Sequence, residues 1–143
     1  MRVNKYVLDA NIWFSYFISK QENYLAFTIF ENGLSVFYCN ELLDEINRVT
    51  GYNRIKKYGI RSKAVIDFIK MTSIHHTLTY PIRNYIPSDK DDSYIVALAL
   101  QTNSGFITTG DSHILSQKEN LEARYRKLKI INKAEFEKMF PLQ

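Results

Sequence analysis

The chain has 143 residues with a formal net charge of +4, and 45% of them are hydrophobic and 24% charged, which is ordinary for a globular protein with its own core. We therefore expect a single domain over residues 1–143. No run reaches the roughly 20 apolar residues of a membrane span, no signal-peptide core follows Met1, and the single Cys39 excludes an internal disulfide, so we expect a cytoplasmic protein with no membrane partner.

The first half of the chain alternates between strand and helix patterns. In order, we expect a strand over 5–10, a helix after Asn11, a helix over 23–31, a strand over 34–39 and a helix over 41–49. Asn11 and Asn40 can cap the first and third of these helices. The helical pattern of 52–74 is interrupted at Gly59, which favours two short helices there.

The second half continues this alternation around one apolar helix. In order, we expect a strand over 75–80, a loop from Pro81 to Asp92, a central buried helix, a strand over 105–109, a short helix with a connection over 113–127, a strand over 128–131 and a helix over 133–140. Strands separated by helices predict an α/β fold with a mainly parallel sheet. Ligands of such sheets bind outside the carboxyl ends of the strands.

Two carboxylates directly follow predicted strands. Asp9 ends the first strand, and Asp111 follows the strand over 105–109. Either acid can simply cap the next helix, although Asn11 is also available for the first of them. The hydroxyl of Thr109 lies at the same strand end and is able to hydrogen-bond a nearby carboxylate. These positions make a site at the carboxyl edge of the sheet a reasonable hypothesis.

A third acid, Glu45, lies at the border of a buried helix face. At about 100° per residue, Leu42, Leu43, Ile46 and Val49 share one apolar stripe of the 41–49 helix, and Glu45 lies roughly 90° from its centre. The side chain can therefore face a cleft. Pairing with a neighbouring Lys or Arg is the simpler alternative for a residue at this position.

A cluster of acids opens the central helix. Asp89, Asp91 and Asp92 stand within four residues, where the helix dipole and free N–H groups favour negative charge. Capping by Ser88 or Asp89 explains one polar residue of the cluster. Because three acids so close together repel one another, capping alone explains the cluster poorly.

Four of these acids could converge at the carboxyl edge of the sheet, namely Asp9, Glu45, Asp92 and Asp111. If they do, their negative charges repel one another and require positive charge nearby. Each close pair costs about 4 kcal/mol at roughly 4 Å with an effective dielectric near 20, so the cluster needs protonation or a divalent cation. Ligands that are all oxygen favour Mg²⁺ or Mn²⁺. Ions held by carboxylates suit hydrolysis of phosphodiester bonds, because they activate water and stabilise the leaving oxygen.

Basic residues are concentrated in two segments that could attract a polyanion. The first segment, over 48–70, contains the candidate RNA-binding residues Arg48, Arg54, Lys56, Lys57 and Arg61. The second covers 124–129. Solvated helix faces are the simpler interpretation, and charge alone favours it.

In this order, the segments resemble the motifs of PIN domains, and in particular of PIN-type (VapC-like) toxins of bacterial toxin–antitoxin pairs. The similar segments are Val7–Asn11, Glu41–Glu45, Asp89–Ala99, Ile107–Leu115 and Ile130–Phe136. The resemblance implies a three-layer α/β/α sandwich with a five-stranded sheet of order 3-2-1-4-5. It also implies an endoribonuclease that depends on Mg²⁺ or Mn²⁺, cuts RNA, is neutralised by a cognate antitoxin and commonly forms a homodimer.

The resemblance also assigns roles to individual residues. By motif position, the acidic, metal-holding site corresponds to Asp9, Glu45, Asp92 and Asp111, and the supporting polar positions correspond to Asn11 and Thr109. His113 stands where many relatives carry a further acid, so a full second metal site does not follow from the resemblance.

Two other functions remain open from the sequence. One is a degenerate PIN fold that binds RNA or a protein partner without cutting, which the histidine at position 113 makes worth considering. The other is a haloacid-dehalogenase-like phosphatase using Asp9, but Asp9-Ala10-Asn11 lacks the second Asp of that family.

Overall fold

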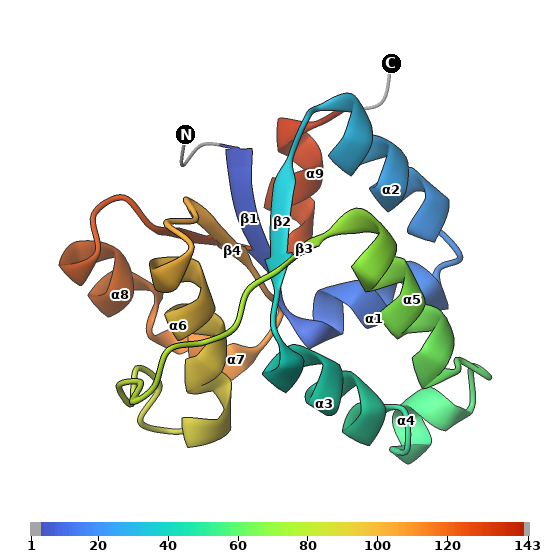
Figure 1. Ribbon diagram of the computed structural model, residues 1–143, viewed down its shortest axis with the longest axis horizontal. Helices are drawn as coiled ribbons and strands as arrows, with labels where there is room; N and C mark the ends of the chain where they lie inside the picture. Colours follow the sequence, from blue (N-terminus) through green and yellow to red (C-terminus); the bar gives the residue numbers. More distant parts are fainter. Residues whose placement is uncertain (1–3, 142–143) are drawn as a thin grey trace.

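A computed structural model of the chain describes residues 4–141, which form a five-stranded sheet covered by helices on both faces (Figure 1). The strands are β1 (Lys5–Leu8), β2 (Ser35–Tyr38), β3 (Ile74–His75), β4 (Phe106–Thr108) and β5 (Lys129–Ile131). All neighbouring strands are parallel and their order is β3-β2-β1-β4-β5. The predicted fold class and strand order are confirmed.

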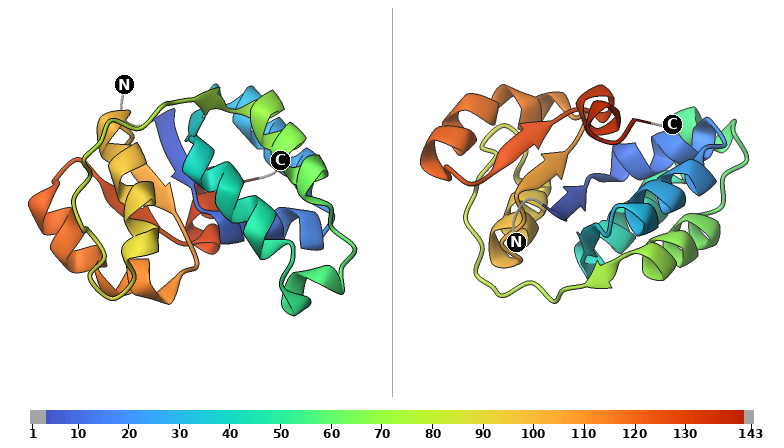
Figure 2. Two further views of the ribbon diagram at one scale, coloured as in Figure 1. Left: turned by 60° about the horizontal axis from the view of Figure 1, so that its bottom comes forward. Right: turned by 90° about the horizontal axis from the view of Figure 1, so that it is seen from above.

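The helices connect the strands and enclose the sheet. In chain order they are α1 (Ala10–Ile18), α2 (Glu22–Glu31), α3 (Asn40–Val49), α4 (Asn53–Lys56), α5 (Ser62–Thr72), the 3-10 helix η2 (Lys90–Asp92), α6 (Ser93–Gln101), α7 (Ser112–Ser116), α8 (Lys118–Arg124) and α9 (Lys133–Met139). The views of Figures 1 and 2 place α6 on one face of the sheet and α9 on the other. Within residues 4–141, no helix is both long and apolar enough to cross a membrane.

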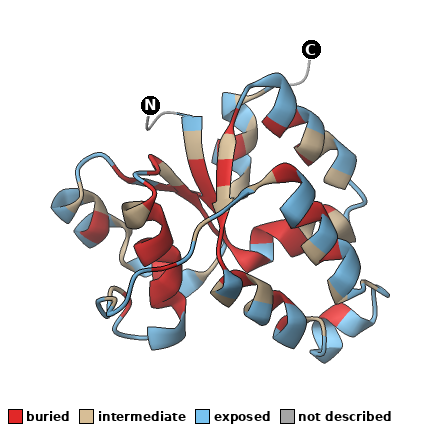
Figure 3. Ribbon diagram, in the orientation of Figure 1, coloured by how far each residue is buried: buried red, intermediate tan, exposed pale blue. Residues whose placement is uncertain are grey.

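Aromatic residues dominate the core beneath the last helix. The rings of Tyr6 and Phe106 lie in register on β1 and β4 and stack with centroids 4.8 Å apart. Phe136 of α9 meets Tyr6 edge-on at 5.5 Å. On the opposite face, α6 is buried along most of its length, as Figure 3 shows. This burial holds the start of α6, and with it Asp92, rigidly against the sheet.

The third strand is shorter than the predicted 75–80, because the chain leaves the sheet after His76. The amide of His76 still donates to the carbonyl oxygen of Tyr38 at 2.8 Å. Beyond it, the side chain of Gln101 satisfies Thr79, accepting from its amide at 2.8 Å and donating to its carbonyl oxygen at 2.9 Å. A side chain of α6 thus replaces β2 as the hydrogen-bonding partner of this segment.

Two further expectations need correction. Asn11 does not cap α1, since the helix starts at Ala10 and the side chain of Asp9 accepts the Ala10 amide at 2.8 Å. Likewise, α3 begins at Asn40 itself and follows Cys39. The expected break at Gly59 does separate two helices, and this residue adopts a positive φ of 67° that glycine tolerates well.

Candidate active site

The carboxyl ends of the two central strands bring Asp9 and Asp111 into one hydrogen-bonded unit. Leu8 and Thr108 are register partners on β1 and β4, so the residues that follow them leave the sheet side by side. The hydroxyl of Thr109 donates to Asp9 Oδ2 at 2.8 Å and accepts from the amide of Asp111 at 3.0 Å. One buried hydroxyl therefore contacts both acids at the ends of the two strands.

Asp9 is buried, with only 3% of its surface exposed. Burial raises the pKa of its carboxyl to about 7, and the negative charge of Glu45 acts in the same direction. Hydrogen bonds from Thr109 and from the Ala10 amide oppose the rise in pKa. Asp9 therefore both caps α1 and belongs to an electrostatically unfavourable group of acids, so the two roles expected for it are compatible.

Asp92 is the buried acid whose carboxylate has the fewest hydrogen bonds to offset its loss of water. It is 7% exposed, and its Oδ2 is buried without a hydrogen-bond partner among the described residues. Burial raises its pKa to about 8, and the charges of Asp111 and Asp89 add to the effect. The neighbouring Asp89 accepts the Asp91 amide at 3.1 Å and so performs the capping role, as one of the two predicted candidates. This leaves the Asp92 carboxylate free of capping.

Glu45 reaches the site from α3, half-buried at the border of the apolar face as predicted. The hydroxyl of Tyr94 donates a hydrogen bond to its carboxylate. Burial raises the pKa of Glu45, whereas Tyr94 and the nearby Arg48 lower it. Tyr94 was not expected from the sequence as a site residue, although a tyrosine in an otherwise aliphatic, buried segment needs a partner for its hydroxyl.

Asp111 caps α7 with a single carboxylate oxygen. Its Oδ1 accepts the amides of His113 at 2.7 Å and Ile114 at 3.2 Å. His113 itself is exposed, and its Nδ1 lies 3.0 Å from the Ser88 hydroxyl. The histidine therefore links α7 to the segment that precedes Asp92.

Asn11, expected as a helix cap and as a supporting polar residue, connects α1 to the turn after β4. Its Oδ1 accepts the Gly110 amide at 3.0 Å, and its Nδ2 lies 3.4 Å from Asp9 Oδ2. A Cβ at Gly110 would lie 3.5 Å from Asn11 Oδ1. Asn11 thus fixes the spacing between the segments that carry Asp9 and Asp111.

A pocket of about 590 Å³ opens beside these acids. Glu45 and Asp111 lie on its acidic side, Arg54 and Lys57 line its basic side, and apolar residues such as Phe14 complete it. The structure thus brings two of the five predicted RNA-binding residues to a pocket that two of the acids share. We call it the α3–α4 pocket.

The other three basic candidates lie elsewhere. Arg48 lines a smaller pocket together with Glu45 and Tyr94. Lys56 and Arg61 are exposed, and neither lines the α3–α4 pocket or the smaller pocket beside Arg48. Any contact of these two side chains with RNA would therefore be made on an open surface.

The donor set of this site fits a hard divalent cation. Within residues 4–141, no three acidic, histidine or cysteine side chains converge closely enough to hold an ion as they stand. However, the acids raise one another's pKa, and a buried carboxylate oxygen of Asp92 lacks a partner. A cation that prefers oxygen ligands would compensate the negative charges and give this Asp92 oxygen a partner.

Comparisons with known proteins identify the family and the fold. A family model described as PIN domain matches residues 5–113. Among solved structures, the chain is similar to VapBC2 from Rickettsia felis bound to a DNA fragment from their promoter, with a TM-score of 0.54 and 14% sequence identity over 90% of this chain and 98% of the other. At this identity the structural similarity concerns the fold alone. A search of curated proteins finds no match to the sequence.

Proposed function

Because the chain belongs to the PIN domain family, we propose that it is a Mg²⁺- or Mn²⁺-dependent endoribonuclease and the toxin of a type II toxin–antitoxin pair. The observation that carries this proposal is the buried, unpartnered Oδ2 of Asp92 beside three other acids at the carboxyl edge of the sheet. A carboxylate kept in such an environment destabilises the fold unless a cation or proton compensates it.

In this proposal, Asp9, Glu45, Asp92 and Asp111 together hold the metal. The bound ion supplies an activated water and charge stabilisation for the leaving oxygen of the phosphodiester. The protein contributes orientation: Thr109 and the Ala10 amide fix Asp9, and Tyr94 fixes Glu45. Asn11 and Thr109 keep the two strand ends at a constant spacing. These residues define the site before the substrate arrives.

RNA would approach across the basic side of the α3–α4 pocket. Arg54 and Lys57 line this pocket together with Glu45 and Asp111, so a phosphate bound to them lies next to the acids. Arg48, Lys56 and Arg61 add positive charge around the approach. Phosphate contacts of this kind position a strand without selecting its sequence.

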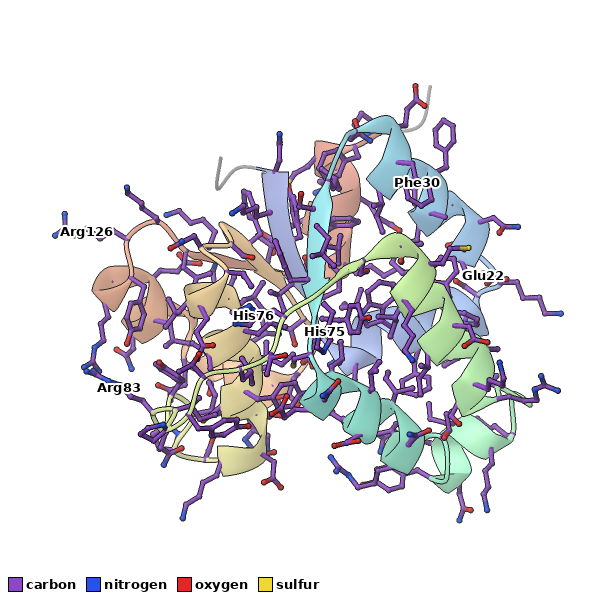
Figure 4. The ribbon with its side chains drawn as sticks, in the orientation of Figure 1. Glu22, Phe30, His75, His76, Arg83 and Arg126 are labelled. Atoms are coloured by element: carbon purple, nitrogen blue, oxygen red, sulfur yellow. The ribbon has the colours of Figure 1, made fainter. Side chains whose placement is uncertain are left out.

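A protein partner is the second part of the proposal. The similar solved structure is VapBC2 bound to a DNA fragment from their promoter, and by analogy we assign a cognate antitoxin to this chain. Large apolar side chains available to a partner include Phe27 and Phe30 of α2 and Met71 of α5, which are 56%, 60% and 65% exposed. Figure 4 shows Phe30 on the outer side of α2. An antitoxin or a second copy of the chain would remove such surface from water.

Cleavage of single-stranded and structured RNA with added Mg²⁺ or Mn²⁺ tests the proposal. We expect Asp9→Asn and Asp92→Asn to lower the cleavage rate by more than about 100-fold, since each removes a direct metal ligand. Asp67→Asn is the matched control, because Asp67 is exposed and pairs only with Lys63 on α5. Wild-type cleavage by both site variants would show that the acids are assigned wrongly.

The same experiment distinguishes a binding module from a nuclease. The histidine at position 113, where the resemblance places a further acid in many relatives, favours this second candidate function. Tight RNA binding by the wild-type chain without any metal-dependent cleavage would identify the chain as a degenerate PIN domain. Metal-dependent cleavage would exclude it.

A further inference from the structure

A second pocket, of about 320 Å³, lies between α8 and the segment that leads to Asp92. Its walls include Arg83, Asn84 and Tyr85 on one side and Arg124 and Tyr125 on the other. Its volume is at the lower end of the roughly 300–1,000 Å³ range of small-molecule sites. A single nucleotide, rather than a longer piece of chain, matches this size. We call it the α8 pocket.

The α8 pocket is positively charged, and no acidic residue of its described lining balances this charge. None of the described residues that line it is acidic, and neither Arg83 nor Arg124 forms a salt bridge within residues 4–141. The nearby acid Glu122 is already engaged, since it accepts from Lys118 at 2.6 Å and from the Ile130 amide at 2.8 Å. Two free guanidinium groups around a concave surface are well suited to phosphate.

The pocket also offers aromatic rings and amide groups. Tyr85 and Tyr125 meet edge to face, with centroids 6.1 Å apart and planes at 71°. The ring that presents its edge therefore has neither of its own faces covered by the other ring. The guanidinium of Arg124 lies 5.8 Å from the centre of the Tyr125 ring. The amide side chains of Gln117 and Asn120 line the same space. Aromatic faces stack on bases, and amides hydrogen-bond their edges.

The two walls of the α8 pocket belong to the segments that carry Asp92 and Asp111. Pro87 lies five residues before Asp92, which limits their Cα separation to about 18 Å. Gln117 lies six residues after Asp111, and at the helical rise this corresponds to about 9 Å. The helix α8 packs on β5, whereas α3 follows β2, and Figure 1 shows α8 on one side of β1 and β4 and α3 with α4 on the other. The elements that form the two pockets therefore flank the two strands that lead to Asp9 and Asp111.

We propose that the α8 pocket binds one unpaired nucleotide of the RNA substrate, with the base against Tyr85 or Tyr125 and the phosphate on Arg83 and Arg124. This inference rests on the proposed nuclease function, because it extends the path of the same RNA strand past the acids. The strand would then contact basic residues on both sides of the bond that is cut. Binding of an unstacked base restricts the substrate to single-stranded segments and ends.

Equilibrium binding of a fluorescent single-stranded RNA to the chain carrying Asp92→Asn tests this inference without cleavage. We expect Tyr85→Leu to weaken binding by roughly 5- to 150-fold, the effect of losing one base–aromatic stack. Arg124→Ala should also weaken binding and reduce its salt dependence by about one released counterion. In addition, an RNA carrying 5-iodouridine should cross-link to Tyr85 or Tyr125.

Two matched variants separate the pocket from general charge and from general loss of a tyrosine. Arg126→Ala removes the same charge two residues from Arg124, on the same flank as Arg83 (Figure 4) but outside the pocket lining. Tyr80→Leu removes an exposed tyrosine from the same connecting segment. Both should bind RNA within about twofold of the parent chain.

The outcomes distinguish this inference from the proposed function. If Arg124→Ala and Arg126→Ala weaken binding equally and Tyr85→Leu has no effect, the α8 pocket is not a nucleotide site, whereas cleavage by the wild-type chain would still support the nuclease. If the wild-type chain neither binds nor cleaves RNA, both are wrong. Thermal melting of each variant verifies that the fold is intact.

Discussion

The two buried carboxyl groups make the stability of the metal-free protein depend on pH. The pKa is raised to about 8 for Asp92 and about 7 for Asp9, whereas both have the ordinary value of 3.8 in the unfolded chain. Between about pH 4 and pH 8 the folded protein therefore retains protons that the unfolded chain has released. The free energy of unfolding consequently falls as the pH rises through this window.

We expect Asp92→Asn to raise the Tm of the metal-free chain at pH 8 and to flatten its dependence on pH. Each kcal/mol of relieved destabilisation corresponds to about 2–4 °C for a domain of this size. Melting in the presence of a chelator from pH 4 to pH 8 measures the effect. Asp67→Asn, at an exposed ion pair, should leave the slope unchanged. Parallel melting profiles of Asp92→Asn and the wild type would mean that Asp92 is not protonated in the fold.

Tyr94 is expected to be a positioning residue for Glu45. Tyr94→Phe removes the hydroxyl that donates to Glu45 while keeping the ring in the core. We expect kcat for RNA cleavage to fall by about 10-fold, as for loss of a group that orients a metal ligand, with little change in KM. Tyr16→Phe is the control, because it removes a comparable hydrogen bond to Glu137, 2.9 Å long, on a different part of the molecule. Equal effects of the two substitutions on kcat would exclude a positioning role.

At the scale of elements, the segment from β3 to η2 depends on the side chain of Gln101. Gln101 makes both backbone hydrogen bonds to Thr79 and lies 3.0 Å from His76 Nε2. We expect Gln101→Ala to destabilise the protein by about 1–2 kcal/mol, because it leaves these groups without their partner. Faster hydrogen exchange should be confined to the segment that follows β3. Gln21→Ala, at an exposed site before α2, should not change that exchange.

Most helices and strands could be predicted from the local sequence pattern, because the central residues of each form a short apolar run bounded by turn residues. The strand over 75–80 was the exception, since its alternation is weak and the hydrogen bonds of Thr79 go to a side chain 22 residues away. Likewise, Asp9 rather than Asn11 caps α1, because both residue types can cap and only the start of the helix decides between them. A contact between distant segments determined the first outcome, and the residue at which the helix begins determined the second.

The order of the acids along the chain predicts which of them could share a site, but it does not predict most of the contacts that orient them. Thr109 was expected from the resemblance, and the structure adds that its hydroxyl serves Asp9 and Asp111 at once. The bond from Tyr94 to Glu45 joins residues 49 positions apart, on α6 and α3. Periodicity in a single segment carries no information about such a pair. The α8 pocket could not be predicted from the sequence, in which only the basic stretch over 124–129 indicates a positively charged surface there.

At the scale of the whole molecule, positive charge is expected to control RNA affinity more than the rate of cleavage. Replacing Arg54 and Lys57 together by Ala removes the basic side of the α3–α4 pocket. We expect KM to rise with a smaller change in kcat, and the salt dependence of binding to fall by up to about two counterions. Lys63→Ala with Lys70→Ala is a control of equal charge on α5. An equal loss of affinity in both double variants would show that the effect is general electrostatics.

Thr109 connects the first strand to the fourth, and this connection bears on when the activity can arise during synthesis. Asp9 leaves the ribosome early, but its partners at Asp92, Thr109 and Asp111 are made roughly a hundred residues later, and β4 must pair with β1 before the acids meet. A nascent chain that ends before β4 therefore has no assembled site, and the acids can meet only after Thr109 and Asp111 have left the ribosome.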